Sequence, residues 1–256
     1  MPEPSPETPL IRVRGVHQYF GENHVLRGVD IDIHRGETVC LLGNSGGGKT
    51  VLVKHMLGLM QPREGNIEVD GIEISNMGER ALGPVRKKMG MMFQNGALFD
   101  SLNVAQNIAF PLREDGINDV DELNRRVSEV LEIVRLPGQE ETMPSALSGG
   151  MKKRVALARA IVDHPACICY DEPHAGLDPI TADTIDKLIK CLQKDHGITN
   201  IVITHELRSV FRIADRIVFM KDGQVYWEGT PSEMKASTDP TIVQFLTGTD
   251  GEGDAW

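Results

Sequence analysis

The apolar residues of this chain are grouped in short continuous runs that alternate with segments of helical periodicity. The stretches "ETVCLLG", "CICYDE" and "NIVITH" each contain an apolar run of strand length. Ile185, Leu188, Ile189 and Leu192 recur between the last two at the spacing of one helix face, and Gly197 marks the end of this helix. Buried strands that alternate with helices predict a mainly parallel sheet with helices on both faces.

Two stretches have the pattern of a β-hairpin. In "GNIEVDGIEI" and in "RIVFMKDGQVYWEG", an Asp-Gly pair lies between two strand-like segments. Asp-Gly suits the two-residue turns in which both residues have positive φ. We therefore expect turns at Asp70-Gly71 and at Asp222-Gly223, and we also expect strands with turns over residues 10–42.

Residues 97–146 are more polar than the rest of the chain and are expected to be mostly helical. One helix face is marked by Leu123, Val127, Val130, Leu131 and Val134. We interpret this region as a helical subdomain inserted into the core. The chain then divides into a disordered tail (1–9), a core (10–94 and 156–235), a helical subdomain (95–155) and a C-terminal tail (236–256).

The composition narrows the possible locations and partners. A hydrophobic content of 40% over 256 residues allows a large core, whereas no apolar run is long enough to span a bilayer. The stretch "MPEPSPETPL" lacks the basic and apolar regions of a signal peptide. We expect a cytosolic protein that reaches a membrane only through a partner. The net charge of -10 argues against electrostatic binding of the protein to nucleic acid.

No disulfide framework is expected, and the Cys167-x-Cys169 pair is expected to be two buried free thiols. Cys40, Cys167, Cys169 and Cys191 are scattered along the chain, which does not suit a disulfide framework. Cys167 and Cys169 lie in an apolar, strand-like run, and no His or Cys follows at the spacing of a zinc site. We therefore expect no metal at these thiols.

A glycine-rich stretch, "GNSGGGKT", joins an expected strand to an expected helix. The spacing G-x-x-x-x-G-K-T in this context is that of a phosphate-binding loop. Glycines let backbone N–H groups approach phosphates, and the helix N-terminus adds partial positive charge. We expect Lys49 to reach the outer phosphates and the Thr50 hydroxyl to ligate Mg²⁺. The expected phosphate-binding residues are Gly43, Asn44, Ser45, Gly46, Gly47, Gly48, Lys49, Thr50 and Val51.

Two further elements carry chemistry of their own. Asp171 and Glu172 follow an expected strand, at the end where ligands bind in open α/β sheets. We expect Asp171 to hold Mg²⁺ and Glu172 to polarise an attacking water as a base. In "LSGGM", Ser148 is expected to cap a helix beside Gly149 and Gly150, which makes a second anion-binding helix start.

Together, and in this order, these elements resemble the nucleotide-binding subunits of ABC transporters over residues 10–235. "GNSGGGKT" is similar to Walker A, "CICYDE" to Walker B and "LSGGM" to the signature motif. Gln94 matches the Q-loop, Asp178 the D-loop, His205 the switch histidine, and Phe20 the aromatic residue that stacks on adenine. The resemblance implies an α/β P-loop NTPase fold: a RecA-like, mainly parallel sheet with helices on both faces, an antiparallel β subdomain and an inserted helical subdomain.

The resemblance also implies an ATPase that binds ATP and Mg²⁺. Gln94 would ligate Mg²⁺ and take part in catalysis with Glu172 and His205. Two subunits would form a homodimer in which Walker A of one chain and the signature of the other close on the same nucleotide. The two anion-binding helix starts agree with this, because one nucleotide does not easily reach both within one chain.

Three positions depart from the family pattern or leave its meaning open. Met151 stands where the signature usually has glutamine, and Val51 stands where a second hydroxyl residue is common. His174, two residues after Glu172, is either a group that titrates near the site or an ordinary loop histidine.

Two further assignments rest on weak local signals. Tyr19 is an alternative to Phe20 as the residue that stacks on adenine. The run Lys152, Lys153 and Arg154 is expected to be a solvated helix turn.

The segment after Gln94 indicates a class of transporter. "GALFDSLNV", "NIAFPL", "LSGGM" and "GLDPIT" together are similar to the ATPases of Mla/MCE-type lipid transporters. This resemblance implies phospholipid transport through an integral membrane permease, an MCE-type lipid-binding partner, and a peripheral location on the cytoplasmic face of the inner membrane. We expect the permease to contact residues 97–112, whose apolar side chains Leu98, Phe99, Leu102 and Phe110 exceed the needs of a small core.

Other functions stay open from the sequence alone. Alternatively, the chain is the ATPase of an importer for another small substrate. Many such ATPases share a segment like "ALFDSLNV". A soluble ABC ATPase is a weaker alternative, because such proteins usually have tandem cassettes or a long coiled coil. A small-molecule kinase would leave "LSGGM" unexplained.

Overall fold

The computed structural model describes residues 8–248, and these residues form a large mixed sheet and a smaller antiparallel sheet. The smaller sheet has the strand order β2-β1-β4-β5. Its strands are β1 (Ile11–Phe20), β2 (Asn23–Ile33), β4 (Glu64–Val69) and β5 (Ile72–Glu73). The antiparallel β subdomain expected from the family resemblance is therefore present.

The larger sheet has the strand order β10-β9-β3-β8-β7-β6. Its strands are β3 (Thr38–Gly43), β6 (Met89–Met92), β7 (Cys167–Asp171), β8 (Thr199–Ile203), β9 (Arg216–Lys221) and β10 (Gln224–Gly229). Every neighbouring pair is parallel except β9 and β10. The prediction of a mainly parallel sheet is confirmed, and the carboxyl ends of β3, β6, β7 and β8 meet at one edge.

Alternate residues of the central strands face two separate cores. In β3, Val39 and Leu41 belong to one hydrophobic cluster, whereas Cys40 and Leu42 belong to the other. This division follows from the two-residue period of a strand. Both faces of the large sheet are therefore covered, which explains why its strands are continuous apolar runs rather than alternating ones.

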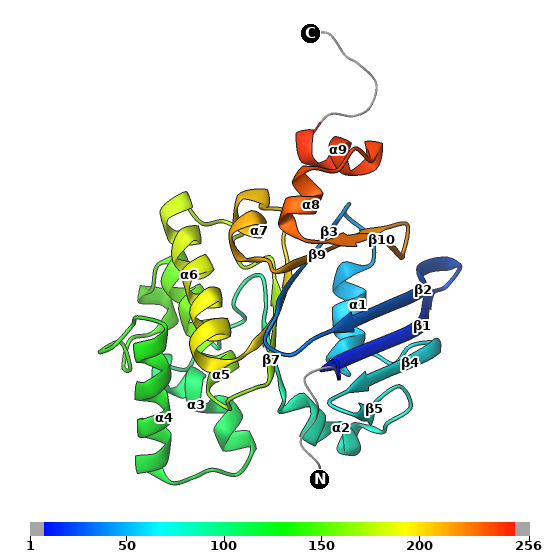
Figure 1. Ribbon diagram of the computed structural model, residues 1–256. Coiled ribbons are helices and arrows are strands. Elements are labelled where there is room, and N and C mark those ends of the chain that lie inside the picture. Colours follow the sequence, from blue (N-terminus) through cyan, green and yellow to red (C-terminus); the bar gives the residue numbers. More distant parts are fainter. Residues whose placement is uncertain (1–7, 249–256) are drawn as a thin grey trace.

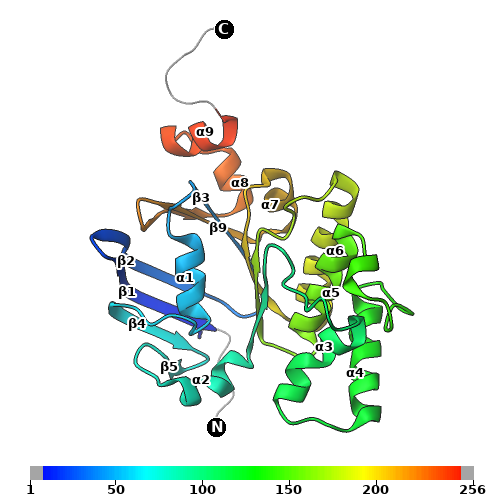
Figure 2. The same ribbon diagram turned by 180° about the vertical axis from the view of Figure 1, so that it is seen from behind.

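Helices cover the large sheet on both faces. On one face, α1 (Lys49–Met56) lies between the two sheets, and its Leu52, Val53 and Met56 pack into the core that they share (Figure 2). On the other face lie α5 (Gly149–Ile161), α6 (Pro179–His196) and α7 (Leu207–Ile213) (Figure 1). Short α2 (Glu79–Arg86) precedes β6.

The helical region consists of α3 (Val104–Glu114), α4 (Val120–Ile133), the 3-10 turn Pro144–Ala146 and α5. The face of α4 predicted from the sequence is buried, including Val127 and Leu131. Figure 1 places these helices at the side of the molecule opposite the small sheet. Helix α5 crosses the boundary between residues 155 and 156 that the sequence pattern suggested, so the subdomain and the core share this helix.

Both predicted hairpin turns are confirmed. Asp70 and Gly71 have φ of 53° and 76°, and Asp222 and Gly223 have φ of 52° and 78°. These values belong to the turn type that Asp-Gly favours.

The C-terminal region contains more structure than a tail. Helices α8 (Pro231–Lys235) and α9 (Pro240–Thr247) follow β10, and Ile242 of α9 is fully buried. Asp239 starts α9 by accepting hydrogen bonds from the N–H groups of Thr241 and Ile242. The segment from 236 treated as a tail in the sequence thus includes a docked helix, while 249–256 and most of the N-terminal tail lie outside the described residues. Within residues 8–248, no helix has the length and apolar character that crossing a bilayer requires.

Candidate active site

The glycine-rich loop connects β3 to α1 at the carboxyl edge of the large sheet. Gly43 has φ of 133°, and a Cβ there would lie 2.0 Å from the carbonyl oxygen of Met220. Gly48 has φ of 92°, and a Cβ there would lie 2.6 Å from Cδ2 of Leu26. Glycine is therefore required at both ends of the loop, for conformation and for space. Between them, residues 44–46 are exposed.

Lys49 is folded back over this loop. Its side chain is buried, and Nζ donates hydrogen bonds to the carbonyl oxygens of Gly43 at 2.7 Å and Asn44 at 2.9 Å. Burial lowers the pKa of Lys49, while the nearby carboxylates of Glu172 and Asp171 oppose that shift. The ammonium group is thus held at the loop, next to the two acidic residues.

The first turn of α1 has no side-chain cap. Its N-cap residue is Gly48, and half-buried Thr50 follows Lys49 in the first turn. The N–H groups at this helix start therefore donate no hydrogen bond to a capping side chain, and they add to the positive potential of Lys49. A phosphate group fits this combination of donors.

Asp171 ends β7 beside this loop, and Glu172 follows it. Burial raises the pKa of Asp171, and the charges of Lys54, Lys49 and Lys153 partly offset the rise. Glu172 has φ of 47°, an uncommon value for a residue with a side chain. Its N–H donates to the carbonyl oxygen of Ile203 at 2.9 Å.

His205 lies beside Glu172. Its Nε2 atom is 3.2 Å from Oε1 of Glu172. Both residues follow neighbouring parallel strands, β7 and β8, and this parallel pairing brings them together. A water that contacts both groups would have the carboxylate as a proton acceptor and the imidazole as a polar neighbour.

Gln94 reaches the same place through its backbone. It follows β6, which pairs with β7, and its side chain is exposed. Its carbonyl oxygen accepts a hydrogen bond from Nζ of Lys153, which also donates to the carbonyl oxygen of Glu172 at 3.2 Å. Lys153 was not predicted from the sequence to belong to this site.

The interpretation of residues 152–154 as a solvated helix turn is wrong for two of the three side chains. Lys153 is buried, and Arg154 is half-buried and donates to the carbonyl oxygens of Val134 and Arg135. A signal for Lys153 existed: it lies on the same helix face as buried Gly150 and buried Leu157, three residues after the first and four before the second.

The signature residues occupy the start of α5. Ser148 is the N-cap, and its hydroxyl accepts a hydrogen bond from the N–H of Met151 at 3.3 Å. Ser148 and Gly149 are exposed, whereas a Cβ on buried Gly150 would lie 2.3 Å from Cγ2 of Thr181. Met151 thus contributes only its backbone N–H to the cap. The presence of methionine where the family usually has glutamine therefore leaves this hydrogen bond to Ser148 intact.

Phe20, Ser148 and Asp178 are among the predicted site residues that make no hydrogen bond or ion pair with Lys49, Asp171, Glu172 or His205 within residues 8–248. Asp178 instead caps α6, where its carboxylate accepts from the N–H groups of Ile180 and Thr181 at 3.0 Å and from the Thr181 hydroxyl. These hydrogen bonds, the Thr181 hydroxyl first, lower the pKa of Asp178.

The two aromatic candidates differ in their neighbours. The Tyr19 ring stacks on His24 with centroids 4.0 Å apart, and Nε2 of His24 is 3.0 Å from Nδ1 of His17. Phe20 is 47% exposed and contacts no other ring among the described residues. Its free face favours Phe20 for stacking on a base.

His174 is not an exposed loop residue. It is buried, and its Nε2 lies 2.8 Å from Oδ1 of Asp186, a buried residue of α6. Its Nδ1 lies 3.4 Å from the hydroxyl of Thr204, which directly precedes His205. Asp186 was not predicted from the sequence, although its place beside Ile185 on a buried helix face was a signal.

The donor set suits a magnesium nucleotide. The hydroxyl of Thr50, the carboxylate of Asp171 and the side-chain oxygen of Gln94 are hard oxygen ligands of the kind that Mg²⁺ prefers together with phosphate oxygens. Asp171 is close enough to Lys49 for their charges to interact, so a metal held by Asp171 would share phosphates with Lys49. The residues present therefore fit both groups.

Comparison with known proteins assigns the family. Residues 26–175, more than half of the chain, match the model of the "ABC transporter" family. The intermembrane phospholipid transport system ATP-binding protein MlaF of Haemophilus influenzae is 40% identical over 239 residues, which cover 93% of this chain and 90% of that protein. The methionine import ATP-binding protein MetN of Brucella abortus is 37% identical over 95% of this chain, which spans 66% of its length.

A solved structure supports the same assignment. The dimeric post-hydrolysis state of the ATP-binding cassette MJ0796, bound to ADP and Pi, aligns with a TM-score of 0.79 at 31% identity. The alignment covers 86% of this chain and 98% of that chain. Its P-loop NTPase fold is the fold expected from the sequence. The chain therefore belongs to the ABC transporter family, as a nucleotide-binding subunit that hydrolyses ATP.

Proposed function

We propose that this subunit powers the transport of phospholipid through a separate membrane permease. The finding that supports the choice of cargo is the similarity to MlaF, which extends over nearly the whole length of both chains. A methionine-type importer is the second candidate, since MetN has a similar level of identity. On either reading the subunit works at the cytoplasmic face of the membrane, held there by the permease.

In the proposed reaction, the glycine-rich loop and Lys49 hold the phosphates. Thr50, Asp171 and Gln94 hold Mg²⁺, which would neutralise charge on the phosphate oxygens. Glu172 accepts a proton from the attacking water, and His205 orients that water and the terminal phosphate. The short distance between Glu172 and His205 supports this pairing.

The complete site is proposed to need two subunits. Ser148 and Gly149 are exposed at a helix start, yet they make no contact with the phosphate loop of their own chain within residues 8–248. In a homodimer, this helix start would meet the nucleotide held by the other chain. Asp178 and the loop before it would then lie near the same interface, with Phe20 stacked on the adenine.

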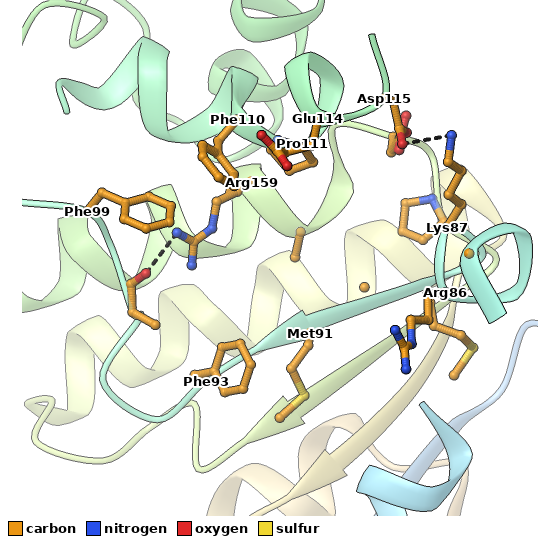
Figure 3. A pocket seen from close by; sticks show the side chains of 17 residues that line it. Arg86, Lys87, Met91, Phe93, Phe99, Phe110, Pro111, Glu114, Asp115 and Arg159 are labelled. Carbon is orange, nitrogen blue, oxygen red and sulfur yellow. Dashed lines mark hydrogen bonds and ion pairs between the residues drawn. The ribbon is translucent and has the colours of Figure 1, made fainter. Parts of the chain in front are cut away.

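Coupling to a permease is supported by a groove of about 690 Å³ that begins next to Gln94. Phe99, Phe110 and Phe93 line it, and Figure 3 shows the Phe99 and Phe110 rings beside Arg159. The centroids of Phe99 and Phe110 are 4.7 Å apart, and Phe99 is 43% exposed. An exposed Phe99 stacked against half-buried Phe110 in a groove suits the insertion of an apolar segment from a partner.

The turn that carries Phe99 is built to present it. Asn107 is fully buried, and its amide nitrogen donates to the carbonyl oxygens of Phe99, Leu102 and Asn103. Its side-chain oxygen accepts from the N–H of Phe99 at 2.8 Å. These hydrogen bonds hold the turn in place. Of the apolar residues predicted for the contact, only Phe99 is exposed, whereas Leu98 and Leu102 are half-buried.

Reconstitution tests the proposed cargo. The subunit would be co-purified with the permease from its own genome, placed in vesicles, and supplied with ATP. We expect transfer of a fluorescent phospholipid that depends on ATP, with an MCE-type lipid-binding protein as acceptor or donor. Uptake of radiolabelled methionine without phospholipid transfer would contradict the lipid proposal and favour the importer.

A further inference from the structure

We propose that Lys153 is a positioning residue for ATP hydrolysis: its ammonium group holds the peptide carbonyls of Gln94 and Glu172 and attaches both residues to the signature helix. This inference rests on the proposed roles of Gln94 and Glu172. It adds a residue of α5 that acts through these two and does not itself touch the reacting atoms.

The contacts of Lys153 are unusual for a lysine. Its side chain is 6% exposed, although lysine is seldom buried without partners. Its Nζ donates to the carbonyl oxygen of Glu172 at 3.2 Å and to that of Gln94. These carbonyls belong to loops after different strands, β7 and β6. Within residues 8–248, Lys153 is the side chain that hydrogen-bonds to both loops.

The contact with Glu172 fixes an uncommon backbone conformation. Glu172 has φ of 47°, a conformation that a residue with a side chain adopts only when its surroundings favour it. Its N–H is held by the carbonyl of Ile203, and its carbonyl is held by Lys153. These two bonds fix the direction of the Cα–Cβ bond, and with it the place of the carboxylate beside His205.

The contact with Gln94 belongs to a wider attachment of this loop to α5. Arg159, six residues after Lys153, donates to the carbonyl oxygens of Gly96 and Ala97, both at 2.8 Å. Two cations of one helix thus hold three carbonyls of the segment 94–97. Arg159 donates hydrogen bonds only within this segment, whereas Lys153 also donates one to the carbonyl oxygen of Glu172.

The charge of Lys153 fits its position. Burial lowers the pKa of Lys153, while the negative charges of Glu172 and Asp171 oppose that shift. An apolar side chain of similar length, such as that of methionine, would fill the space but would leave two carbonyl oxygens without a donor. The cation is therefore suited to keep both loops in place next to the acidic residues.

The arrangement gives the signature helix a direct link to the catalytic base. Ser148 caps the same helix five residues before Lys153. A displacement of α5 caused by a nucleotide at Ser148 would move Lys153, and the carbonyls of Gln94 and Glu172 with it. Lys153 would thus relate the state of one nucleotide site in the dimer to the geometry of the other.

Steady-state kinetics of the full chain test the role. For Lys153→Met, we expect kcat to fall about ten- to hundredfold, because misplacement of a catalytic group by about 1 Å has effects of this size. KM for ATP should stay within about twofold of wild type, because the phosphate loop is untouched. Lys153→Arg keeps the charge and the donors and should recover most of kcat. Lys152→Met removes the same charge one residue earlier and should leave kcat unchanged.

A double mutant separates positioning from a general loss of structure. If Lys153 acts through Glu172, Lys153→Met should cause no further loss in a Glu172→Gln background, whereas independent damage would add to it. Binding of a fluorescent ATP analogue checks that each variant is folded. Should Lys153→Met fail to fold, Lys153→Gln, which keeps one donor group, replaces it in every comparison.

The outcomes distinguish this inference from the proposed function. Wild-type kcat in Lys153→Met, with Glu172→Gln inactive, would overturn the positioning role and leave the proposed reaction standing. Parallel losses of kcat and ATP affinity would also overturn it, because they would indicate a binding role. A Glu172→Gln protein with wild-type turnover would instead overturn the proposed reaction itself.

Discussion

Nε2 of His205 lies 3.2 Å from Oε1 of Glu172, although the two residues follow different strands of the large sheet. The parallel pairing of β7 with β8 aligns Asp171 with Ile203, and the loops that follow these residues meet at the sheet edge. Lys49 also lies within reach of the carboxylates at this edge. The arrangement brings together the proposed base Glu172, the proposed phosphate-orienting residue His205 and the proposed phosphate-binding residue Lys49.

The first prediction concerns the proposed base. Glu172→Gln should keep ATP binding and lower turnover by about 10²–10⁴, because an amide does not accept a proton from water. The side chain keeps its size, so the φ of Glu172 and its contact with His205 can be retained. Phosphate release under saturating ATP measures the effect. Turnover within about threefold of wild type would rule out Glu172 as the base.

The second prediction concerns the two-subunit site. In the Glu172→Gln background, Mg-ATP should drive dimer formation, and Ser148→Arg should prevent it by placing bulk and positive charge at the start of α5. Multi-angle light scattering with and without ATP measures the mass. Ser128→Arg, at an exposed position of α4, is the matched control and should still dimerise. Equal dimerisation of all variants would contradict the proposed interface.

The third prediction concerns the pH dependence of stability at Asp70. Burial alone would raise its pKa, but hydrogen bonds and charges from Lys88 and Arg35 outweigh this and lower the pKa. A carboxylate with a lowered pKa in the folded state adds stability above its unfolded pKa of about 3.9, and this stability is lost as the pH falls through the folded pKa. The contribution is modest, because all three side chains are partly exposed.

Asp70→Asn should therefore reduce the free energy of unfolding by about 0.5–1 kcal/mol at pH 7, and by less near pH 3, where the pH approaches the lowered folded pKa. Asparagine tolerates the positive φ of this turn, so the backbone need not change. Urea denaturation at both pH values measures the difference. Asp222→Asn changes the equivalent residue of the second Asp-Gly turn, which makes no ion pair among the described residues, and should cost less at pH 7. An Asp70→Asn effect independent of pH would contradict the electrostatic explanation.

The parts of the structure that could be predicted from sequence are those with local causes. The Asp-Gly turns, the buried strand β3 and the glycine loop each depend on neighbouring residues, and the alternation of strands and helices determined the mainly parallel sheet. The family resemblance added the antiparallel sheet and the order of the motifs. Helix α9 was missed, because its single fully buried residue, Ile242, gives a weak periodic signal.

The contacts that hold the site in place could not be predicted in the same way. Lys153 contacts Gln94 and Glu172 only because α5 packs across the ends of β6 and β7. The periodicity around "KKR" indicates a buried helix face but not these contacts. The buried pair of His174 and Asp186 likewise joins a loop to a helix whose relative position depends on the tertiary fold. Such long-range polar contacts follow from packing, whereas a motif records only spacing.

The last prediction concerns the groove at Phe99 and the phospholipid transport that ATP hydrolysis is proposed to drive. Phe99 is the exposed aromatic residue of the segment after Gln94, and Asn107 holds its turn in place, so Phe99→Ala should remove an apolar contact without disturbing the backbone. An aromatic side chain buried at the centre of an interface typically contributes about 2 kcal/mol or more to binding. We therefore expect weaker permease binding and less phospholipid transfer in vesicles, with near-normal ATPase activity of the free subunit. Leu59→Ala, at an apolar residue that is 51% exposed and does not line the groove, is the control and should transfer lipid normally. Normal transfer by Phe99→Ala would exclude this groove as the permease contact, and equal losses in both variants would indicate a non-specific effect of removing surface apolar groups.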